Sequence, residues 1–498
     1  MTQVVLGVDL GTTSAKATAF DVRGGEHGGG EARYPLDEPA HGHAVQDPGL
    51  VIEATVAAIR QAAASAQAAG AQVCGIALSS AMHSLLALDA HDRPLTPLIT
   101  WADTRAASQA ERLKAEHPEL HARTGTPLHP MAPLPKLVWL REHEPAVCAA
   151  ARRWVGVKEL VLRRLAGEWA LDHSVASGTG LMASRTLDWD PEALQIAGVR
   201  AGQLATLVPA KQCFALTATD LGLPAGVPVI AGAGDGPLAN LGVGAVRPGV
   251  AACSIGTSGA LRVMVEDPRV DPAGRLFCYA LTPGRWAVGG AINNGGVVLR
   301  WAGEALAPDL GEHAEAQLLA LAAEVPAGSE GLIMLPYLLS ERAPHWSALP
   351  RGAYVGLTRG HHRGHLIRAA VEGVCQQLGL VLASVRDAGF EVRELRATGG
   401  FARSDLWRQI LTDVLGMPVG FPAGHQGSGF GAALLGMEAL GLIDSIERAA
   451  DLVAIDEELQ PGAEAAEAYA ELQPVFVSLY DALAPAFRRL RRFDPGSG

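Results

Sequence analysis

Cysteine is scarce in this chain, with six residues among 498. No two of them form a C-x-x-C pair, so the pattern excludes the common zinc and dithiol redox motifs. The residues around Cys74 and Cys253 are apolar and strand-like, which predicts buried free thiols instead of a disulfide framework. Free thiols are typical of a protein that works in a reducing compartment.

Long uncharged apolar runs are also missing. None reaches the roughly 18 residues that span a bilayer, and Met1 leads into an apolar strand without the charged and apolar regions of a signal peptide. Positive charge is low as well, because the formal net charge is -12. This balance argues against nucleic acid as the main partner. We therefore expect a cytoplasmic protein without a nucleic-acid or membrane partner.

One familiar nucleotide motif is absent, since the chain contains no G-x-x-x-x-G-K-[ST] sequence. Instead, an apolar strand that starts at Val4 and carries Asp9 runs into the turn Gly-Thr-Thr-Ser at residues 11–14. Glycine permits a tight turn there, and the following amides and hydroxyls can converge on phosphate. An ordinary hairpin turn is the alternative for such a sequence.

The same pattern occurs again half a chain later. An apolar strand over 251–255 runs into Gly-Thr-Ser at residues 256–258, and a second apolar strand follows. Two such turns indicate two related halves that hold phosphates between them, as phosphoryl transfer requires. The chain is long enough for two cores, and we place the domains at residues 1–247 and 248–498.

Strand-like and helix-like patterns alternate in both halves, which predicts an α/β fold of mixed sheets covered by helices. In the first half we expect hairpin strands over 4–21 and after the glycine cluster 24–30, a helix over 48–69 and a strand over 73–80. The later expected elements are a proline-rich loop at 127–135, a helix at 136–144, a strand at 394–398 and a C-terminal alanine-rich helix with a solvated arginine cluster at 488–492.

Asp235 is the candidate for the chemistry. It follows a short apolar strand over 227–231 and stands between Gly234 and Gly236, which leave room for a substrate hydroxyl. A carboxylate in this place can act as a general base when a phosphoryl group arrives at that hydroxyl. A helix N-cap is the alternative, for which aspartate is well suited. The two phosphate-binding turns favour the general base.

Seven motifs extend these observations over most of the chain: DLGTTSAK at 9–16, AMHS at 81–84, TWADTR at 100–105, GAGDG at 232–236, SIGTSG at 254–259, LLSERAPHW at 338–346 and TGGFARSDLWRQILTDVLG at 398–416. Together they resemble the FGGY family of carbohydrate kinases, and they occur in the family's order. The resemblance implies two actin-like, ribonuclease-H-like (ASKHA) domains around a central cleft. Four segments are most similar to the gluconokinase branch of this family, namely 79–89, 98–106, 129–140 and 289–301.

The resemblance also implies roles for single residues. Asp235 matches the catalytic base, and Asp9 matches a carboxylate that acts on Mg²⁺ through water, which suits an ion that dehydrates reluctantly. Arg300 has an alternative role as a salt-bridged helix residue. The residues expected to contact ATP are Gly11, Thr12, Thr13, Ser14, Lys16, Gly256, Thr257, Ser258, Gly296, Arg300 and, in the adenosine motif, Gly399, Gly400 and Ser404.

For the acceptor, the resemblance implies contacts from Met82, His83, Trp101, Asp103, Arg105 and Asp235. Asp103 and His83 can hold hydroxyls, and the planar fork of Arg105 suits a carboxylate. A surface ion pair is the alternative for Arg105, and core packing is the alternative for Trp101. Two further candidates for the carboxylate are Lys136 and Lys158.

Two features depart from this pattern. His425 and Gln426 stand where many relatives carry an acidic residue, so the nucleotide preference can differ from theirs. The trio His361, His362 and His365 has a spacing that suits a metal, but no carboxylate pattern accompanies it. We expect this trio to lie in a solvated loop.

We therefore expect a kinase that uses ATP and Mg²⁺ to convert D-gluconate to 6-phospho-D-gluconate, with domain closure to exclude competing water. Xylulose, or another ketose or polyol, is the nearest alternative acceptor. An actin-like module in which ATP drives a change of shape without a sugar is the alternative of another class, and a sugar-sensing regulator is a third. The resemblance leaves a homodimer open.

Overall fold

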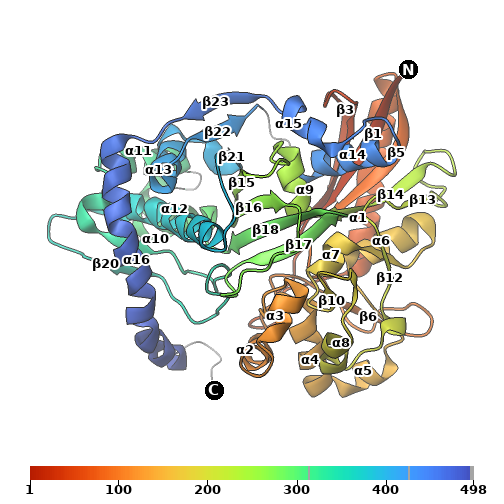
Figure 1. The fold of residues 1–498 in the computed structure, drawn as a ribbon, viewed down its shortest axis with the longest axis horizontal. Helices are drawn as coiled ribbons and strands as arrows, with labels where there is room; N and C mark the ends of the chain where they lie inside the picture. The colour runs from red at the N-terminus through yellow and green to blue at the C-terminus, as the bar shows by residue number, and fades with distance from the viewer. Residues whose placement is uncertain (312–313, 424–426, 494–498) are drawn as a thin grey trace.

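Two large mixed β-sheets form the frame of the protein (Figure 1). The computed structural model describes residues 1–311, 314–423 and 427–493. The first sheet has the order β13 (Cys213–Ala215), β14 (Pro228–Gly234), β5 (Ala71–Ser80), β1 (Thr2–Leu10), β2 (Ser14–Phe20) and β3 (Glu26–Arg33). The second has the order β17 (Phe277–Thr282), β18 (Arg285–Ile292), β16 (Gly259–Val265), β15 (Val250–Ile255), β21 (Glu394–Thr398), β22 (Val419–Pro422) and β23 (Ile455–Leu459).

Both sheets follow one pattern. In the first, β1 pairs antiparallel with β2 and parallel with β5, which in turn is parallel to β14. In the second, β15 pairs antiparallel with β16 and parallel with β21, which is parallel to β22. The Gly-Thr turns at 11–13 and 256–258 join the antiparallel pairs of the two sheets. The expected α/β fold of two related halves is therefore confirmed.

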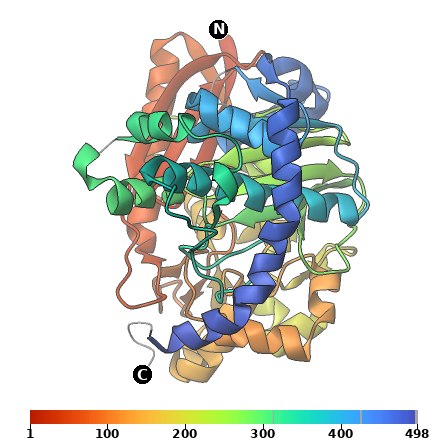
Figure 2. The same cartoon turned by 90° about the vertical axis from the view of Figure 1, so that its left-hand side faces the viewer.

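Helices cover both sheets. Those of the first half are α1 (Pro48–Ala68), α2 (Ala107–Glu116), α3 (Glu119–Thr124), α4 (Pro133–His143), α5 (Pro145–Ala150), α6 (Val157–Ala166), α7 (His173–Ser177), α8 (Pro191–Ala197) and α9 (Asp235–Gly242). Those of the second half are α10 (Gly296–Leu306), α11 (Glu315–Ala323), α12 (Arg363–Asp387), α13 (Asp405–Leu415), α14 (Ser428–Ala439), α15 (Ala449–Leu452) and α16 (Ala463–Leu490). The helix α16 lies along the outside of the second half (Figure 2).

The helix α12 is long and apolar enough to cross a membrane by length and composition, but 83% of its most apolar stretch is buried inside the protein. Its side chains belong to the main hydrophobic core of the second half. Its buried charges Arg368 and Glu372 are paired, since Arg368 Nε lies 2.7 Å from Glu372 and Tyr469 donates a hydrogen bond to the same carboxylate. These features are those of a core helix.

The helix α14 crosses from the second half to the first and packs against β1, β5 and α9 (Figure 1). Glycine makes this packing possible, because a Cβ at Gly7 would lie 1.9 Å from the carbonyl oxygen of Gly429. A Cβ at Gly431 would lie 2.0 Å from the carbonyl oxygen of Leu238 in α9. One core thus joins residues from both sides of residue 247, and the expected division at this residue stays a prediction.

Most expected elements are present, and the differences have local causes. The strand β3 begins at Glu26, inside the glycine cluster and not after it, because its glycines pack closely on α1: a Cβ at Gly30 would lie 2.4 Å from the Ala58 carbonyl oxygen. The helix α4 begins at Pro133, three residues before the expected start, since proline is accepted in a first helical turn. All six cysteines are free, but Cys74, Cys148 and Cys213 are only partly buried.

The contact between α14 and α9 yields a first prediction. The substitution Gly431→Ala places a methyl group against the Leu238 carbonyl, so we expect the free energy of unfolding to fall by about 1–3 kcal/mol. Urea unfolding followed by circular dichroism measures this change. Gly202→Ala is the matched control, because nothing lies within 4 Å of the added atom. Equal urea midpoints for Gly431→Ala and Gly202→Ala would contradict this prediction, because they would show that α14 and α9 accept the added methyl group without loss of stability.

Candidate functional site

Asp235 stands where β14 ends and α9 begins, and Gly234 occupies the N-cap position instead of Asp235. Its Oδ1 accepts a hydrogen bond from the amide of Gly236 at 2.7 Å. No residue in the described part of the chain donates to its Oδ2. Gly234 lies against Met82, because a Cβ there would be 2.7 Å from the Met82 sulfur. One carboxylate oxygen of Asp235 is thus left for a substrate. It lies beside residues 82–83 and 101–105, which are expected to bind the acceptor and are called the acceptor segment below.

A second carboxylate lies near Asp235. Asp9 is next to the end of β1, and its Oδ1 accepts a hydrogen bond from the Ser79 hydroxyl of β5 at 2.8 Å. Burial raises the pKa of Asp235 to about 6, and the negative charge of Asp9 acts in the same direction, whereas Arg262 and Arg342 oppose it. A carboxyl group that titrates near the working pH is suited to general base catalysis.

The first Gly-Thr turn, which is expected to bind phosphate, is held by side chains around it. Tyr34 donates to the Gly11 carbonyl at 2.6 Å, and Gln46 donates to the Thr12 carbonyl at 2.5 Å. The indole of Trp101 donates to the Thr12 hydroxyl at 2.8 Å, which links this turn to the expected acceptor segment. Lys16 stands opposite Asp9 in the β1–β2 register, but its side chain is 58% exposed and lies 3.8 Å from Glu31.

The second turn is held by the start of α10. The amide of Gly296 donates to the Gly256 carbonyl at 2.7 Å, and the amide of Val297 donates to the Thr257 carbonyl at 3.3 Å. A Cβ at Gly296 would lie 2.8 Å from the Gly256 carbonyl oxygen, so glycine is needed for this approach. The amino end of a helix next to such a turn is a favourable place for phosphate.

A cavity of about 800 Å³ adjoins the second turn. Gly256, Thr257, Gly296, Arg300 and Gly400 line it, together with apolar side chains that include Leu299, Phe401 and Leu318. Its size and mixed lining suit a nucleoside.

Two other residues of the adenosine motif have structural contacts. Gly399 has φ of 120°, and a Cβ there would lie 2.2 Å from the Ile255 carbonyl oxygen. The hydroxyl of Ser404 accepts a hydrogen bond from the Trp407 amide and caps α13. His425 and Gln426 lie outside the described residues.

His83 occupies a strained backbone position, with φ of 69°. Its Nδ1 lies 2.7 Å from the Gly178 carbonyl oxygen, so Nδ1 carries the proton and Nε2 is an acceptor. Burial lowers the pKa of His83 to about 3, which keeps the ring neutral at physiological pH. A neutral acceptor at this place can bind a hydroxyl of a sugar.

Lys136 holds the acceptor segment together. Its buried ammonium donates three hydrogen bonds, to the carbonyls of His83 (2.7 Å), Thr100 (2.6 Å) and Met131 (2.7 Å). Burial lowers the pKa of Lys136 to about 7. All three protons of the ammonium are used by the chain itself, which fixes the backbone at His83 and next to Trp101.

The other expected cations are also engaged. Arg105 binds Asp103 through Nε (2.9 Å) and Nη2 (2.7 Å), and Asp103 additionally accepts a hydrogen bond from the Ala44 amide (2.8 Å). Lys158 lies 2.8 Å from Asp172, with both side chains fully buried. These pairs leave little capacity for a substrate carboxylate, although the expected contacts of Asp103 and Arg105 with the acceptor stay predictions.

The sequence reasoning missed four polar groups near Asp235 and His83. Each has a buried polar atom without a hydrogen-bond partner in the described part of the chain, namely Arg262 Nη1, Arg342 Nε, Tyr279 Oη and His129 Nε2. Arg262 had a signal, because it is the one charge in the apolar strand over 259–265. Arg342 lies within a quoted motif but received no role. His129 likewise lies within the quoted segment 129–140 but received no role, and Tyr279 had no distinctive pattern.

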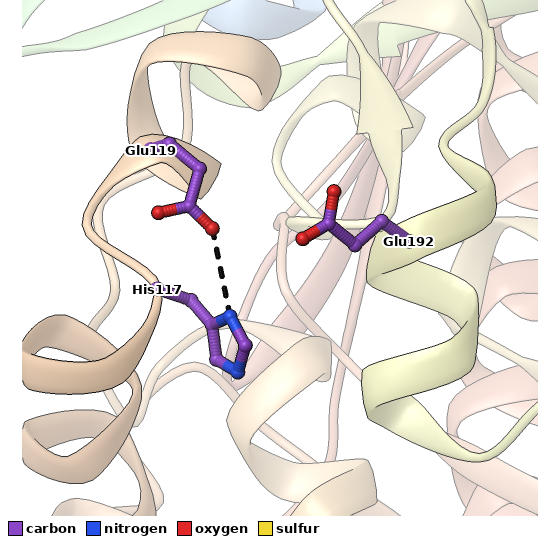
Figure 3. Close-up of side chains that lie close together, drawn as sticks. All are labelled: His117, Glu119 and Glu192. Carbon is purple, nitrogen blue, oxygen red and sulfur yellow. Dashed lines mark ion pairs between the residues drawn. The ribbon is translucent and has the colours of Figure 1, made fainter.

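Other polar clusters fit structural roles. His117 Nδ1 lies 3.5 Å from Glu119, with Glu192 of α8 facing them (Figure 3). All three are partly exposed, and the Glu192 carboxylate already binds Arg123. Of the trio over 361–365, His361 and the exposed His362 lie in the expected loop, where His362 caps α12. His365 departs from the expectation, because it lies in α12, is buried and accepts a hydrogen bond from the His362 amide at 3.3 Å.

Two related α/β halves with paired Gly-Thr turns define a phosphotransferase of the actin-like class. The chain belongs to the FGGY family of carbohydrate kinases: the family's N-terminal domain matches residues 4–242, and its C-terminal domain matches residues 251–440. This membership makes the protein a carbohydrate kinase and decides against the conformational module without a sugar.

Individual relatives indicate which carbohydrate kinases this chain is similar to. The chain is 39% identical to a gluconokinase of Bacillus subtilis, with 100% of this chain and 99% of the relative covered. It is 30% identical to a xylulose kinase of Escherichia coli, with 96% of this chain and 99% of that protein covered. Among solved structures, a gluconate kinase from Lactobacillus acidophilus has a TM-score of 0.93 at 34% identity, covering 98% of this chain and 100% of its own.

The Asp103–Arg105 pair yields a second prediction. Arg105→Met leaves the buried Asp103 carboxylate without its main partner, so we expect a loss of about 3–5 kcal/mol in the free energy of unfolding. Arg93→Met is the control, because Arg93 pairs with Asp89 on the surface and should contribute less than about 1 kcal/mol. Urea unfolding compares the two variants. Unchanged stability together with a raised KM for the acceptor would instead support substrate binding by Arg105.

Proposed function

We propose that this carbohydrate kinase is a gluconokinase, which transfers the γ-phosphoryl group of ATP to the C6 hydroxyl of D-gluconate. The observation that carries the chemistry is the carboxylate of Asp235, which has a free oxygen and a raised pKa and directly follows Gly234, the residue that lies against Met82. The choice of gluconate follows from the similarity to a gluconokinase over the full chain.

In the proposed reaction, the Asp235 carboxylate accepts the proton of the C6 hydroxyl while the hydroxyl oxygen forms a bond to the γ-phosphorus. The bond between that phosphorus and the bridging oxygen breaks, and its electrons stay with ADP. The neutral His83 ring would orient the acceptor through Nε2. The two Gly-Thr turns would hold the phosphates through backbone amides and hydroxyls.

The residues near Asp235 fit Mg²⁺ and ATP. Ser79 binds Oδ1 of Asp9, and no described residue donates to Oδ2, which leaves the single carboxylate contact that this ion commonly makes beside water and phosphates. When bound, the ion would neutralise phosphate charge. The cavity next to Gly256 and Arg300 would hold the adenosine. The free cysteines fit the cytoplasm, where we place the protein.

A xylulose kinase is the second candidate function. A solved xylulose kinase from Lactobacillus acidophilus has the same TM-score of 0.93 and the same 34% identity to this chain as the gluconate kinase of that organism. The mechanism at Asp235 would be unchanged, and only the acceptor would differ.

The acceptor and the base are tested together by release of ADP with gluconate, xylulose, ribulose, glycerol or no acceptor. We expect the highest kcat/KM with gluconate and a fall of about 10²–10⁴-fold in kcat for Asp235→Asn, because the general base is lost. Asp456→Asn, in an exposed position on β23, is the control and should match the wild type. Preference for a ketose would support the second candidate, and an active Asp235→Asn variant would contradict the base.

The raised pKa of Asp235 yields a separate prediction on pH. Only the ionised carboxylate can accept the proton, so kcat/KM for the acceptor should fall about tenfold per pH unit below pH 6 and level off above it. Initial rates between pH 4.5 and about 8, with circular dichroism to verify folding, measure this profile. An acid limb near the ordinary aspartate pKa of about 4 would contradict the assigned environment of Asp235.

A further inference from the structure

The strand β14 is irregular just before Asp235. Its pairing with β13 ends at Ile230, and its register with β5 shifts between Ile230 and Ala233. Gly232 lies within this shift with φ of 72°, and a Cβ there would collide with the Leu78 carbonyl. An irregularity of this kind re-aims the chain that follows it. The sheet alone therefore fixes the direction of Asp235 less firmly than a regular ladder would.

One peptide group after this shift is bound on both sides. Its carbonyl, which belongs to Ala233, accepts a hydrogen bond from the buried ammonium of Lys158 at 2.7 Å. Its N–H, which belongs to Gly234, donates to the Ser174 hydroxyl at 3.1 Å. The carbonyl and the N–H of a trans peptide point in opposite directions, so the two contacts hold the peptide plane from opposite sides. Asp235 follows this peptide directly.

Both contacts depend on residues 172–178, which include α7 and are called the α7 segment below. Lys158 belongs to α6 and forms an ion pair of 2.8 Å with Asp172, with both side chains fully buried. Asp172 is also the N-cap of α7, where its Oδ1 accepts a hydrogen bond from the Val175 amide at 2.9 Å. Ser174 is the second residue of the same helix. The buried ion pair thus ties the start of α7 to the lysine that binds β14.

The other end of the α7 segment binds the acceptor segment and the second half. The Gly178 carbonyl lies 2.7 Å from Nδ1 of His83, and a Cβ at Gly178 would lie 2.9 Å from the same ring. The Ser177 hydroxyl accepts a hydrogen bond from the Ala280 amide of β17 at 3.0 Å. The α7 segment therefore contacts the end of β14, the ring of His83 and a strand of the second half.

We propose that the α7 segment acts, together with Lys158, as one positioning element that sets Asp235 relative to His83 and so to the acceptor hydroxyl. The inference rests on the proposed function, in which Asp235 is the base and His83 orients the acceptor. With its ammonium bound to Ala233 and Asp172, Lys158 is suited to positioning and not to a substrate carboxylate. A base must lie within hydrogen-bond reach of the proton that it accepts, and a misplacement of about 1 Å can cost about 10²-fold in rate.

The test measures release of ADP with the acceptor that the wild-type protein uses best. Ser174→Ala removes the acceptor of the Gly234 amide, so we expect kcat to fall about tenfold while KM for ATP stays unchanged. The double variant Lys158→Met/Asp172→Asn removes the ammonium from the Ala233 carbonyl without leaving an unpaired carboxylate. For this variant we expect kcat to fall by about 10²-fold.

Matched controls separate positioning from a general loss of stability. Ser384→Ala is the control for Ser174→Ala, because Ser384 is a buried serine of α12 whose hydroxyl donates to the Leu380 carbonyl. Arg368→Met/Glu372→Gln is the control for the double variant, because it also removes a buried ion pair. We expect both controls to keep the kcat of the wild type. Urea unfolding and circular dichroism verify that each variant is folded in the assay.

A double-mutant cycle shows whether Ser174 acts through the base. In the Asp235→Asn background, the remaining turnover no longer depends on where a base is held. Ser174→Ala should therefore lower kcat no further in that background, although it lowers kcat about tenfold in the wild type. A residue that served only to stabilise the fold would reduce kcat by the same factor in both backgrounds.

Three outcomes would overturn the proposal, and they can be told apart. Equal kcat for Ser174→Ala and Ser384→Ala would refute the positioning role while the proposed function stands. An equal further loss in the Asp235→Asn background would show that Ser174 acts on another group. An Asp235→Asn variant with the activity of the wild type would refute the base itself, and the positioning role with it.

Discussion

The site depends on two carboxylates that are held close to one another. Asp9 is the next-to-last residue of β1 and Asp235 follows β14, and these two strands lie on either side of β5. Burial raises the pKa of Asp235, and repulsion from Asp9 acts in the same direction, so nearby cations are needed to keep Asp235 ionised near neutral pH. The two largest opposing charges come from Arg262 and Arg342 in the second half, and the buried Lys158 of the first half also interacts with Asp235. The site is therefore complete only when the two sheets face each other.

Buried charges in this protein serve two distinct purposes. Lys136 is bound by three carbonyls and Arg105 by a carboxylate, so both stiffen the segment that carries His83 and Trp101. A buried charge with all of its hydrogen bonds made is costly to move and is suited to positioning. Arg262 has an unsatisfied buried donor, and an unsatisfied donor is suited to a ligand. The number of hydrogen-bond partners thus distinguishes Lys136 and Arg105, which are fully bound by the chain, from Arg262, which is not.

Glycine supplies the close contacts that bring the parts together. Gly296 lets α10 approach the second turn, and Gly431 lets α14 approach the helix that begins at Asp235. In both cases a methyl group would meet a carbonyl oxygen at less than 3 Å. The second Gly-Thr turn and the helix that begins at Asp235 are therefore positioned by backbone packing, which depends on residue size and not on charge.

Local sequence determined the parts that depend on neighbours along the chain. The two Gly-Thr turns, the strands that lead into them and Asp235 after β14 were predictable, because strand periodicity and turn chemistry act over a few residues. The start of α4 and the cap at His362 were missed, since proline in a first turn and histidine as a cap are weak signals. The tertiary structure alone decided whether the buried cations Lys136 and Arg262 have hydrogen-bond partners. The Arg105 pair with Asp103 is local, because the two residues are two positions apart. Lys136 and Arg262 look alike as single charges in sequence, and only the fold shows that Lys136 binds the carbonyls of His83 and Thr100, whereas Arg262 Nη1 has no hydrogen-bond partner among the described residues.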